Sequence, residues 1–247
     1  MRAQFAPVIA AGVASATACA CGRIGFAPLD DGGLTTGDTR LVDGRVIDAP
    51  PNAITVTFGE RTNADFNGVT RDTYISNEAG EPTLNYGATD ELRSELDVDE
   101  RILLRFDLTA IPPTATVFEV LLAVEVTEAN AAADWLVHPL LEAWAEGTSD
   151  GAPGAANFTQ RIVAAAWATT GAGPPMSAGA PFATLKPATL GALIATLPNA
   201  TVQGWITSPA TNQGMIFLNT NTNSARMASR EASPSNNRPM LTVTYVP

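Results

Sequence analysis

The sequence predicts an all-β fold, a jelly-roll-like antiparallel β-sandwich, and three observations lead to this prediction. From residue 53 onward, apolar and polar residues alternate in short runs, as they do in half-buried strands. Glycine, proline and asparagine bound these runs, and segments with helical periodicity are scarce. The composition is 45% hydrophobic and 16% charged over 247 residues, which is typical of a folded domain rather than a disordered chain.

The expected strands follow one another across residues 53–247, which we assign to one domain. The first, Ile54–Phe58, alternates cleanly and stops at Gly59. Residues 162–167 favour at most one helical turn, and prolines limit a helix across residues 185–197. This spacing is typical of a sandwich and not of alternating strands and helices. The expected strands cover residues 54–58, 72–76, 91–98, 101–108, 116–127, 135–144, 200–206, 215–218 and 240–246.

Residues 1–20 have the organisation of a lipoprotein-type signal peptide. After a single arginine, Phe5–Ala18 is uncharged and apolar, too short to span a bilayer and of the length of a signal-peptide core. Small residues then surround Cys19 and Cys21, whose thiols are candidates for lipidation. Cys21 is favoured because it begins a Cys-Gly-Arg sequence similar to the start of many mature bacterial lipoproteins. Lipidation at Cys19, or secretion without a lipid, are the alternatives.

Residues 21–52 are expected to form a flexible acidic linker, because they are polar, rich in Gly and Pro, and without periodicity. A lipid on the cysteine would then be the chain's contact with a membrane. We therefore expect an exported protein of the outer membrane or cell surface, or otherwise a periplasmic or secreted one.

The charge distribution restricts the partners that the protein can have. The formal net charge is −11, which argues against nucleic acid, because a phosphate backbone requires clustered Lys and Arg. No Asp or Glu lies between Gly151 and Arg230, so this stretch tolerates an anionic ligand better than the acidic first half. We expect a monomer.

A series of short motifs along residues 53–246 resembles the DNRLRE domain family. The resemblance implies a β-sandwich related to carbohydrate-binding modules, and polysaccharide, in some members acidic polysaccharide such as alginate, as the partner. The motifs are Asp72-Thr73-Tyr74-Ile75, Asn85-Tyr86-Gly87, Leu103–Leu108 with Ile111-Pro112, Trp144–Gly147, Arg161 with Trp167–Gly171, Asn212-Gln213-Gly214, Ser229-Arg230-Glu231, and Arg238–Leu241 with Val243-Thr244-Tyr245.

Aromatic and guanidinium side chains are the candidate contacts for a sugar ligand. An indole face suits stacking on a sugar ring, and a guanidinium suits a carboxylate. Each Trp has burial in the core as its alternative, and Arg230 and Arg238 have a structural role, such as pairing of Arg230 with Glu231. Arg105 and Asp107 are either a ligand clamp or a structural ion pair. The candidates are Trp135, Trp167, Arg226, Arg230 and Arg238.

The sequence offers no catalytic set, so we expect no enzyme and no cofactor. Trp144 and Glu146 resemble a sugar platform with an acid, but a glycosidase needs a second carboxylate, and residues 151–230 contain none. We interpret Trp144 as buried and Glu146 as a ligand of backbone amides. His138 is the single histidine and lies beside Pro139 in an expected strand, with no nucleophile motif.

The acid-rich stretch from Asp90 to Glu100 leaves a structural calcium ion open, although the same alternation fits the exposed face of a strand. The function we expect from the sequence is that of a non-catalytic cell-envelope lipoprotein that binds polysaccharide. A structural or adhesive surface protein that contacts other envelope proteins is the alternative, and a polysaccharide hydrolase or lyase is the least favoured.

Overall fold

The structure is a computed structural model that describes residues 50–247. The predicted signal peptide, both candidate lipidation sites (Cys19 and Cys21) and nearly all of the predicted linker lie outside the described residues. Within residues 50–247, no helix is long and apolar enough to cross a membrane.

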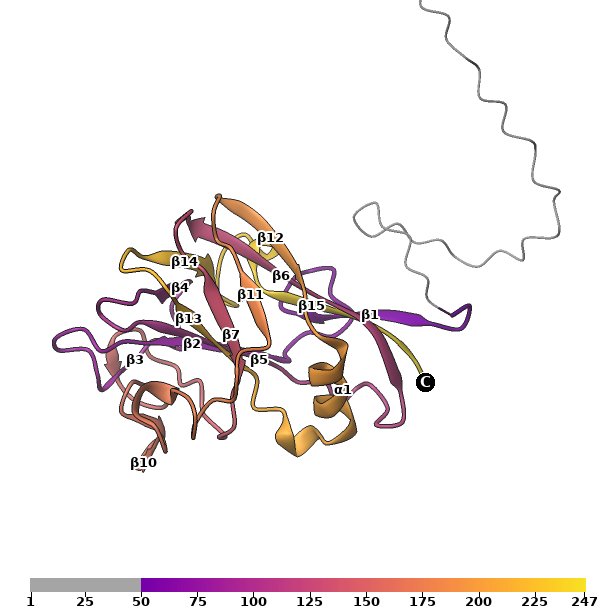
Figure 1. Ribbon diagram of the computed structural model, residues 1–247, viewed down its shortest axis with the longest axis horizontal. Coiled ribbons are helices and arrows are strands. Elements are labelled where there is room, and N and C mark those ends of the chain that lie inside the picture. The colour runs from indigo at the N-terminus through magenta and orange to yellow at the C-terminus, as the bar shows by residue number, and fades with distance from the viewer. Residues whose placement is uncertain (1–49) are drawn as a thin grey trace, which may run out of the picture. The chain divides into compact units, whose positions relative to one another are not determined.

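Two antiparallel sheets form the body of the protein (Figure 1). The larger sheet is centred on β6, and β12 pairs with β6 along the edge opposite β15 and β14. Its strands are β1 (Ile54–Gly59), β15 (Met240–Val246), β6 (Thr116–Glu128), β14 (Ala225–Ala228), β4 (Glu91–Ser94) and β12 (Gly191–Thr196). The smaller sheet has, in spatial order, β11 (Ala183–Leu185), β7 (Trp135–Pro139), β13 (Met215–Asn219), β5 (Arg101–Phe106) and β2 (Thr70–Ile75).

The main core lies between these two sheets, because each strand turns alternate side chains toward the other sheet. In β6, Val120, Leu122 and Val124 are fully buried and face the inner residues of β5, such as Ile102 and Leu104. The predicted all-β, antiparallel sandwich is thereby confirmed.

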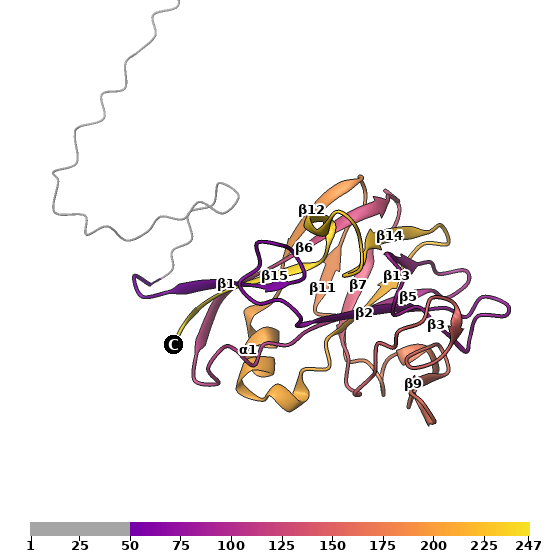
Figure 2. The ribbon, with the colours of Figure 1, turned by 180° about the vertical axis from the view of Figure 1, so that it is seen from behind.

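A second core covers the outer face of the smaller sheet. Leu103 and Ile216 point away from the main core and pack against a long segment, residues 140–182, that folds back over the sheet. Trp144, Phe158 and Trp167 are its large buried side chains. Two short two-stranded sheets belong to this region, β3 (Leu84–Asn85) with β8 (Ala152–Pro153), and β9 (Gln160–Ile162) with β10 (Ala165–Ala166). Both views place β3, β9 and β10 at the end of the sandwich opposite the helix (Figures 1 and 2).

The prediction of a strand over residues 200–206 is wrong, because this segment belongs to helix α1 (Asn199–Thr207). Val202, Trp205 and Ile206 are its buried residues, at the i, i+3, i+4 spacing of a helix face. Residues 185–197, whose pattern is mixed, contain strand β12 (Gly191–Thr196) and no helix. The three 3-10 helices in the described residues are short: Thr170–Ala172, Pro209–Thr211 and Ser235–Asn237.

Candidate functional site

Two arginines lie directly opposite each other on neighbouring strands of the smaller sheet. In the β2–β5 register, Arg71 pairs with Arg105 and Thr73 pairs with Leu103. Leu103 belongs to the outer core, so alternation places Arg105 and Arg71 on that same outer face. We call Arg71 and Arg105 the arginine pair.

The arginine pair is poorly neutralised by its surroundings. Within residues 50–247, Arg105 forms no hydrogen bond and no ion pair, and Arg71 makes only a long contact, 3.8 Å, with the Glu146 carboxylate. Burial lowers the pKa of Arg105, as does the charge of Arg71, whereas Asp107 opposes both. Like charges directly opposite each other in a sheet repel, so an anion placed between these two guanidinium groups would stabilise them.

The backbone beside Arg105 is built around a glycine. Gly214 has φ +82°, and a Cβ added there would lie 2.4 Å from the Leu104 carbonyl oxygen and 2.6 Å from the Arg105 Cβ. Asn212 fixes this turn, since its side chain donates to the Phe106 carbonyl at 2.8 Å and accepts from the Gly214 N–H. Gly214 immediately precedes β13, the strand next to β5, and places no side chain over Arg105. Arg105 therefore remains half-exposed.

A buried charge cluster closes the free edge of β2 beside the arginine pair. Glu146 accepts a hydrogen bond from the Asp72 N–H at 2.7 Å, and Arg230 donates from its guanidinium to the Thr70 carbonyl at 3.2 Å. The Arg230 Nε lies 2.8 Å from Glu146 and 2.7 Å from Glu231. The two side chains thus take up backbone groups that a neighbouring strand would otherwise pair.

Burial dominates the electrostatics of this cluster. It raises the pKa of Glu146 to about 7, although the hydrogen bond from Asp72 and the charge of Arg230 act against it. It also raises the pKa of Asp72 well above its usual range, helped by the charge of Glu231. The prediction that Glu146 binds a backbone amide is confirmed, as is the burial of Trp144, which is 6% exposed.

The two tryptophans predicted as sugar platforms cannot serve as such. Trp135 is 0% exposed, and its Nε1–H donates to the Ser94 hydroxyl across the sandwich at 2.7 Å. Trp167 is 4% exposed and donates to the Asn157 carbonyl inside the outer core. Their indole faces are occupied by the cores, so this part of the site prediction is wrong for a physical reason, namely complete burial with a satisfied N–H.

The three arginines predicted as ligand contacts all have structural partners. Arg226 forms ion pairs with Glu91 at 3.0 Å and Glu128 at 2.9 Å. Arg238 donates to the backbone carbonyls of Ala232 and Glu60, and Arg230 belongs to the cluster described above. The structural alternative considered for Arg230 and Arg238 therefore applies to both, through ion pairs for Arg230 and through backbone carbonyls for Arg238.

Other sequence predictions have mixed outcomes. Arg105 and Asp107 form no ion pair, and Asp107 instead accepts the Thr109 N–H at 3.0 Å. His138 is 5% exposed, and its Nδ1 lies 2.8 Å from the Gly179 carbonyl oxygen. This buried position does not suit a general base, which must reach a substrate. Nothing in the sequence singles out Arg71, because its place opposite Arg105 depends on the strand register.

No protein-family model matches the chain, and no curated protein matches it significantly.

Proposed function

We propose that the sandwich binds an acidic polysaccharide without transforming it, and that the arginine pair, Arg71 and Arg105, contacts the carboxylates of the ligand. The observation that carries this proposal is that Arg71 and Arg105 lie opposite each other in the β2–β5 register, while the 3.8 Å contact of Arg71 with Glu146 is the single ion pair that the two form within the described residues.

The chemistry of the pair suits uronate residues. A guanidinium donates two parallel hydrogen bonds to a carboxylate, and two neighbouring guanidinium groups contact successive carboxylates or hold one between them. Arg71 is reachable, since its side chain is 58% exposed. Neutral sugars are less suitable, because all the Trp and Tyr side chains are buried and offer no stacking face.

The way in which the nearby acids are held supports binding without chemistry on the ligand. Glu146 is 5% exposed and surrounded by Arg230 and the β2 backbone, so neither its proton nor its charge reaches a sugar on the surface. The resemblance to the DNRLRE family agrees with a binding role, and it contributes the choice of polysaccharide as the ligand class.

The test is affinity electrophoresis of the full chain in gels that contain alginate, pectate or neutral dextran. We expect retardation in the two acidic gels and none in dextran. Arg71→Gln should weaken the retardation, and the double variant Arg71→Gln/Arg105→Gln should abolish it. Lys186→Gln is the matched control, because Lys186 is 72% exposed and its loss changes the net charge equally.

Two results would contradict the proposal. One is a folded wild-type chain that no acidic glycan retards. The other is a single variant, Arg71→Gln, that is retarded as strongly as Lys186→Gln, since the effect would then belong to net charge alone.

The proposed location is the cell envelope, with the chain exported and anchored by a lipid on Cys21 or Cys19. Labelling of cells with a radioactive fatty acid tests this location. Label should be lost in Cys21→Ser if Cys21 is the acceptor, and in Cys19→Ser if Cys19 is. Label that persists in a variant lacking both cysteines, or is absent from the wild type, would contradict lipidation.

An adhesive role that depends on contacts with other envelope proteins is the second candidate, and strand β12 favours it. Within the described residues β12 pairs only with β6, so its other edge is unpaired, and the sequence Gly191–Thr196 carries no charge. Ile194 is 49% exposed and Leu190 is 68% exposed. A partner strand can add to such an edge. Cross-linking in cells that is lost with Ile194→Lys, while glycan retardation is absent, would favour this role.

A further inference from the structure

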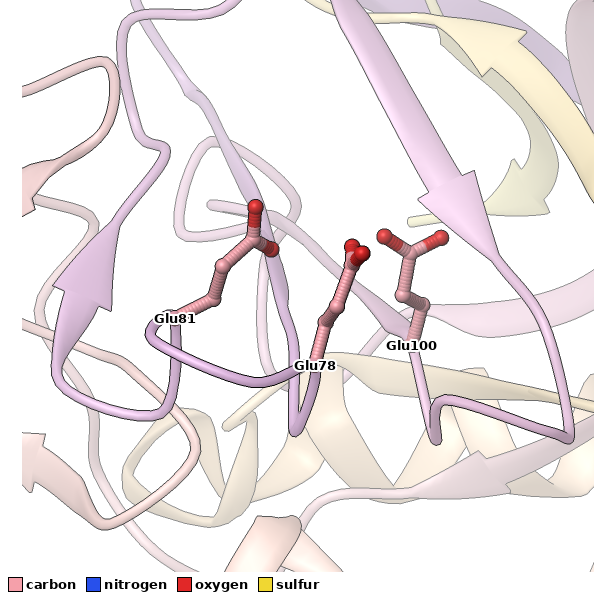
Figure 3. A group of neighbouring side chains, drawn as sticks. All are labelled: Glu78, Glu81 and Glu100. Atoms are coloured by element: carbon pink, nitrogen blue, oxygen red, sulfur yellow. The ribbon is translucent and has the colours of Figure 1, made fainter.

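Three glutamates from two loops converge at the end of the smaller sheet. Glu78 and Glu81 follow β2, and Glu100 immediately precedes β5. One carboxylate oxygen of each glutamate lies within 4.8 Å of one oxygen of each of the other two. Figure 3 shows the three side chains extending in the same direction, with Glu78 between Glu81 and Glu100.

The fold dictates this convergence. Ile75 pairs with Arg101 at the ends of β2 and β5, so the loop that leaves β2 and the residue that enters β5 start side by side. The Asn77 N–H then donates to the Val98 carbonyl at 3.2 Å and ties the two loops together. The Glu81 N–H donates to the Glu78 carbonyl at 2.9 Å, which turns both of these carboxylates toward Glu100.

The buried member of the cluster lacks a partner. Glu100 is 4% exposed, and its carboxylate has no hydrogen bond and no ion pair within residues 50–247. One oxygen of Glu81, Oε2, is also buried without a partner. Burial raises the pKa of Glu100 to about 7, against the charge of Arg93 and with the charges of Glu95 and Glu81. Buried charges are normally paired or bound to a metal, and the described part of the chain offers the Glu100 carboxylate no such partner.

The nearest cation does not take this place. The guanidinium of Arg93 lies over the Tyr74 ring, 5.4 Å from its centre, and forms no ion pair with Glu100. The Arg93 Nε is itself buried without a hydrogen-bond partner. The Arg93 charge therefore lowers the pKa of Glu100 without forming an ion pair with its carboxylate.

We propose that Glu78, Glu81 and Glu100 bind a calcium ion. Three carboxylates supply between three and six oxygens, and Ca²⁺ takes six to eight in flexible geometry. Glu78 is exposed, so water can complete the coordination from its side. Magnesium is less suitable, because it demands near-ideal octahedral geometry. The ion would join the β2–β3 loop to the start of β5 and would stabilise that end of the sheet.

This site differs from the calcium site that the acid-rich stretch suggests. Of that stretch, Glu91 is paired with Arg226 and Asp99 with Arg101, and Glu100 alone belongs to the cluster. The two other ligands, Glu78 and Glu81, come from outside the stretch.

The test is calcium titration of the chelator-treated full chain by calorimetry, followed by thermal unfolding. We expect one ion per chain with a Kd in the range of about 10⁻⁴–10⁻³ M, and a Tm raised by about 3 °C at ten times that concentration. Glu100→Gln should lose at least tenfold in affinity. Its calcium-free form should be more stable than the calcium-free wild type, since an unpaired buried charge is removed.

Asp97→Asn is the matched control, because Asp97 is exposed in the same loop and outside the cluster, and it should bind calcium like the wild type. Glu78→Gln, on an exposed residue, keeps the test valid if Glu100→Gln does not fold, and it should weaken binding likewise. A folded wild type without a calcium response would overturn the proposal. So would equal responses of Asp97→Asn and both glutamate variants, or equal responses to calcium and magnesium.

Discussion

The Trp135 Nε1–H donates a hydrogen bond to the Ser94 hydroxyl at 2.7 Å, and this buried bond joins the two sheets. Trp135 lies in β7 of the smaller sheet and Ser94 in β4 of the larger one. The Ser94 hydroxyl in turn donates a hydrogen bond to the Ala225 carbonyl oxygen, also at 2.7 Å. The largest side chain in the core is thus held by a polar contact as well as by packing.

Ser94→Ala should destabilise the fold by about 1–3 kcal/mol, because it leaves a buried indole N–H and a buried carbonyl without partners. Urea unfolding measures this change. Ser208→Ala, on an exposed hydroxyl without side-chain bonds, should change stability by less than about 0.5 kcal/mol. Equal effects of the two variants would mean that the bond between the sheets contributes nothing.

Glu146→Gln should flatten the pH dependence of stability. Burial raises the folded-state pKa of Glu146 from its ordinary value of 4.5 to about 7, so the proton is bound more tightly in the folded chain. The stability that this proton contributes is complete below about pH 4.5 and is lost as pH rises through about 7. Each pKa unit corresponds to about 1.4 kcal/mol, so the loss is of the order of 1–3 kcal/mol.

The measurement for Glu146 is urea unfolding at several pH values between 4.5 and 8. The wild type should lose stability across this range, and Glu146→Gln should lose less. Asp72 and Glu231 also have raised pKa values, so some slope should remain in the variant. A variant with an unchanged slope would contradict the electrostatic account of this cluster.

Gly214→Ala should be more destabilising than Gly80→Ala, although both glycines have positive φ angles, +82° and +93°. The backbone strain is similar at the two positions. A Cβ at Gly80 would meet nothing within 4 Å, whereas one at Gly214 would collide with Leu104 and Arg105. The difference should be about 1–3 kcal/mol in thermal or urea unfolding. Equal losses would show that the close approach to β5 is not needed.

Binding of acidic glycan should weaken as ionic strength rises, because exposed charges are screened beyond about 10 Å at 0.1 M salt. Retardation in alginate gels, measured from about 0.05 to 0.5 M salt, should fall steeply for the wild type. The fall should be shallower for Arg71→Gln, which has one ionic contact fewer. Retardation that salt leaves unchanged would argue against a role for the arginine pair.

Strand periodicity is the part of the fold that the sequence predicts well. Ile54–Phe58 and Met240–Val246 alternate apolar and polar residues, and both are strands in the structure. Residues 200–206 are ambiguous, because Val202 and Ile206 fit both a period of two and a helix face. The position of Trp205, three residues after Val202, decides for the helix only once the core against which it packs is known.

The candidate sites depend on contacts between residues distant in sequence, which periodicity does not contain. Arg71 and Arg105 meet through strand register, and Glu100 meets Glu78 because Ile75 pairs with Arg101. The burial of a Trp side chain cannot be predicted from the local sequence either, because nothing in the residues around Trp135 distinguishes a sugar platform from a core residue. The Ser94 hydroxyl that accepts the hydrogen bond of its N–H is remote in sequence.

The filled edge of β2 also bears on the solubility of the chain. Glu146 and Arg230 occupy backbone groups that a strand from another molecule would otherwise pair with. Variants that remove either side chain therefore present an open sheet edge as well as a less stable fold. Such variants are expected to aggregate at concentrations where equally destabilised core variants stay dispersed.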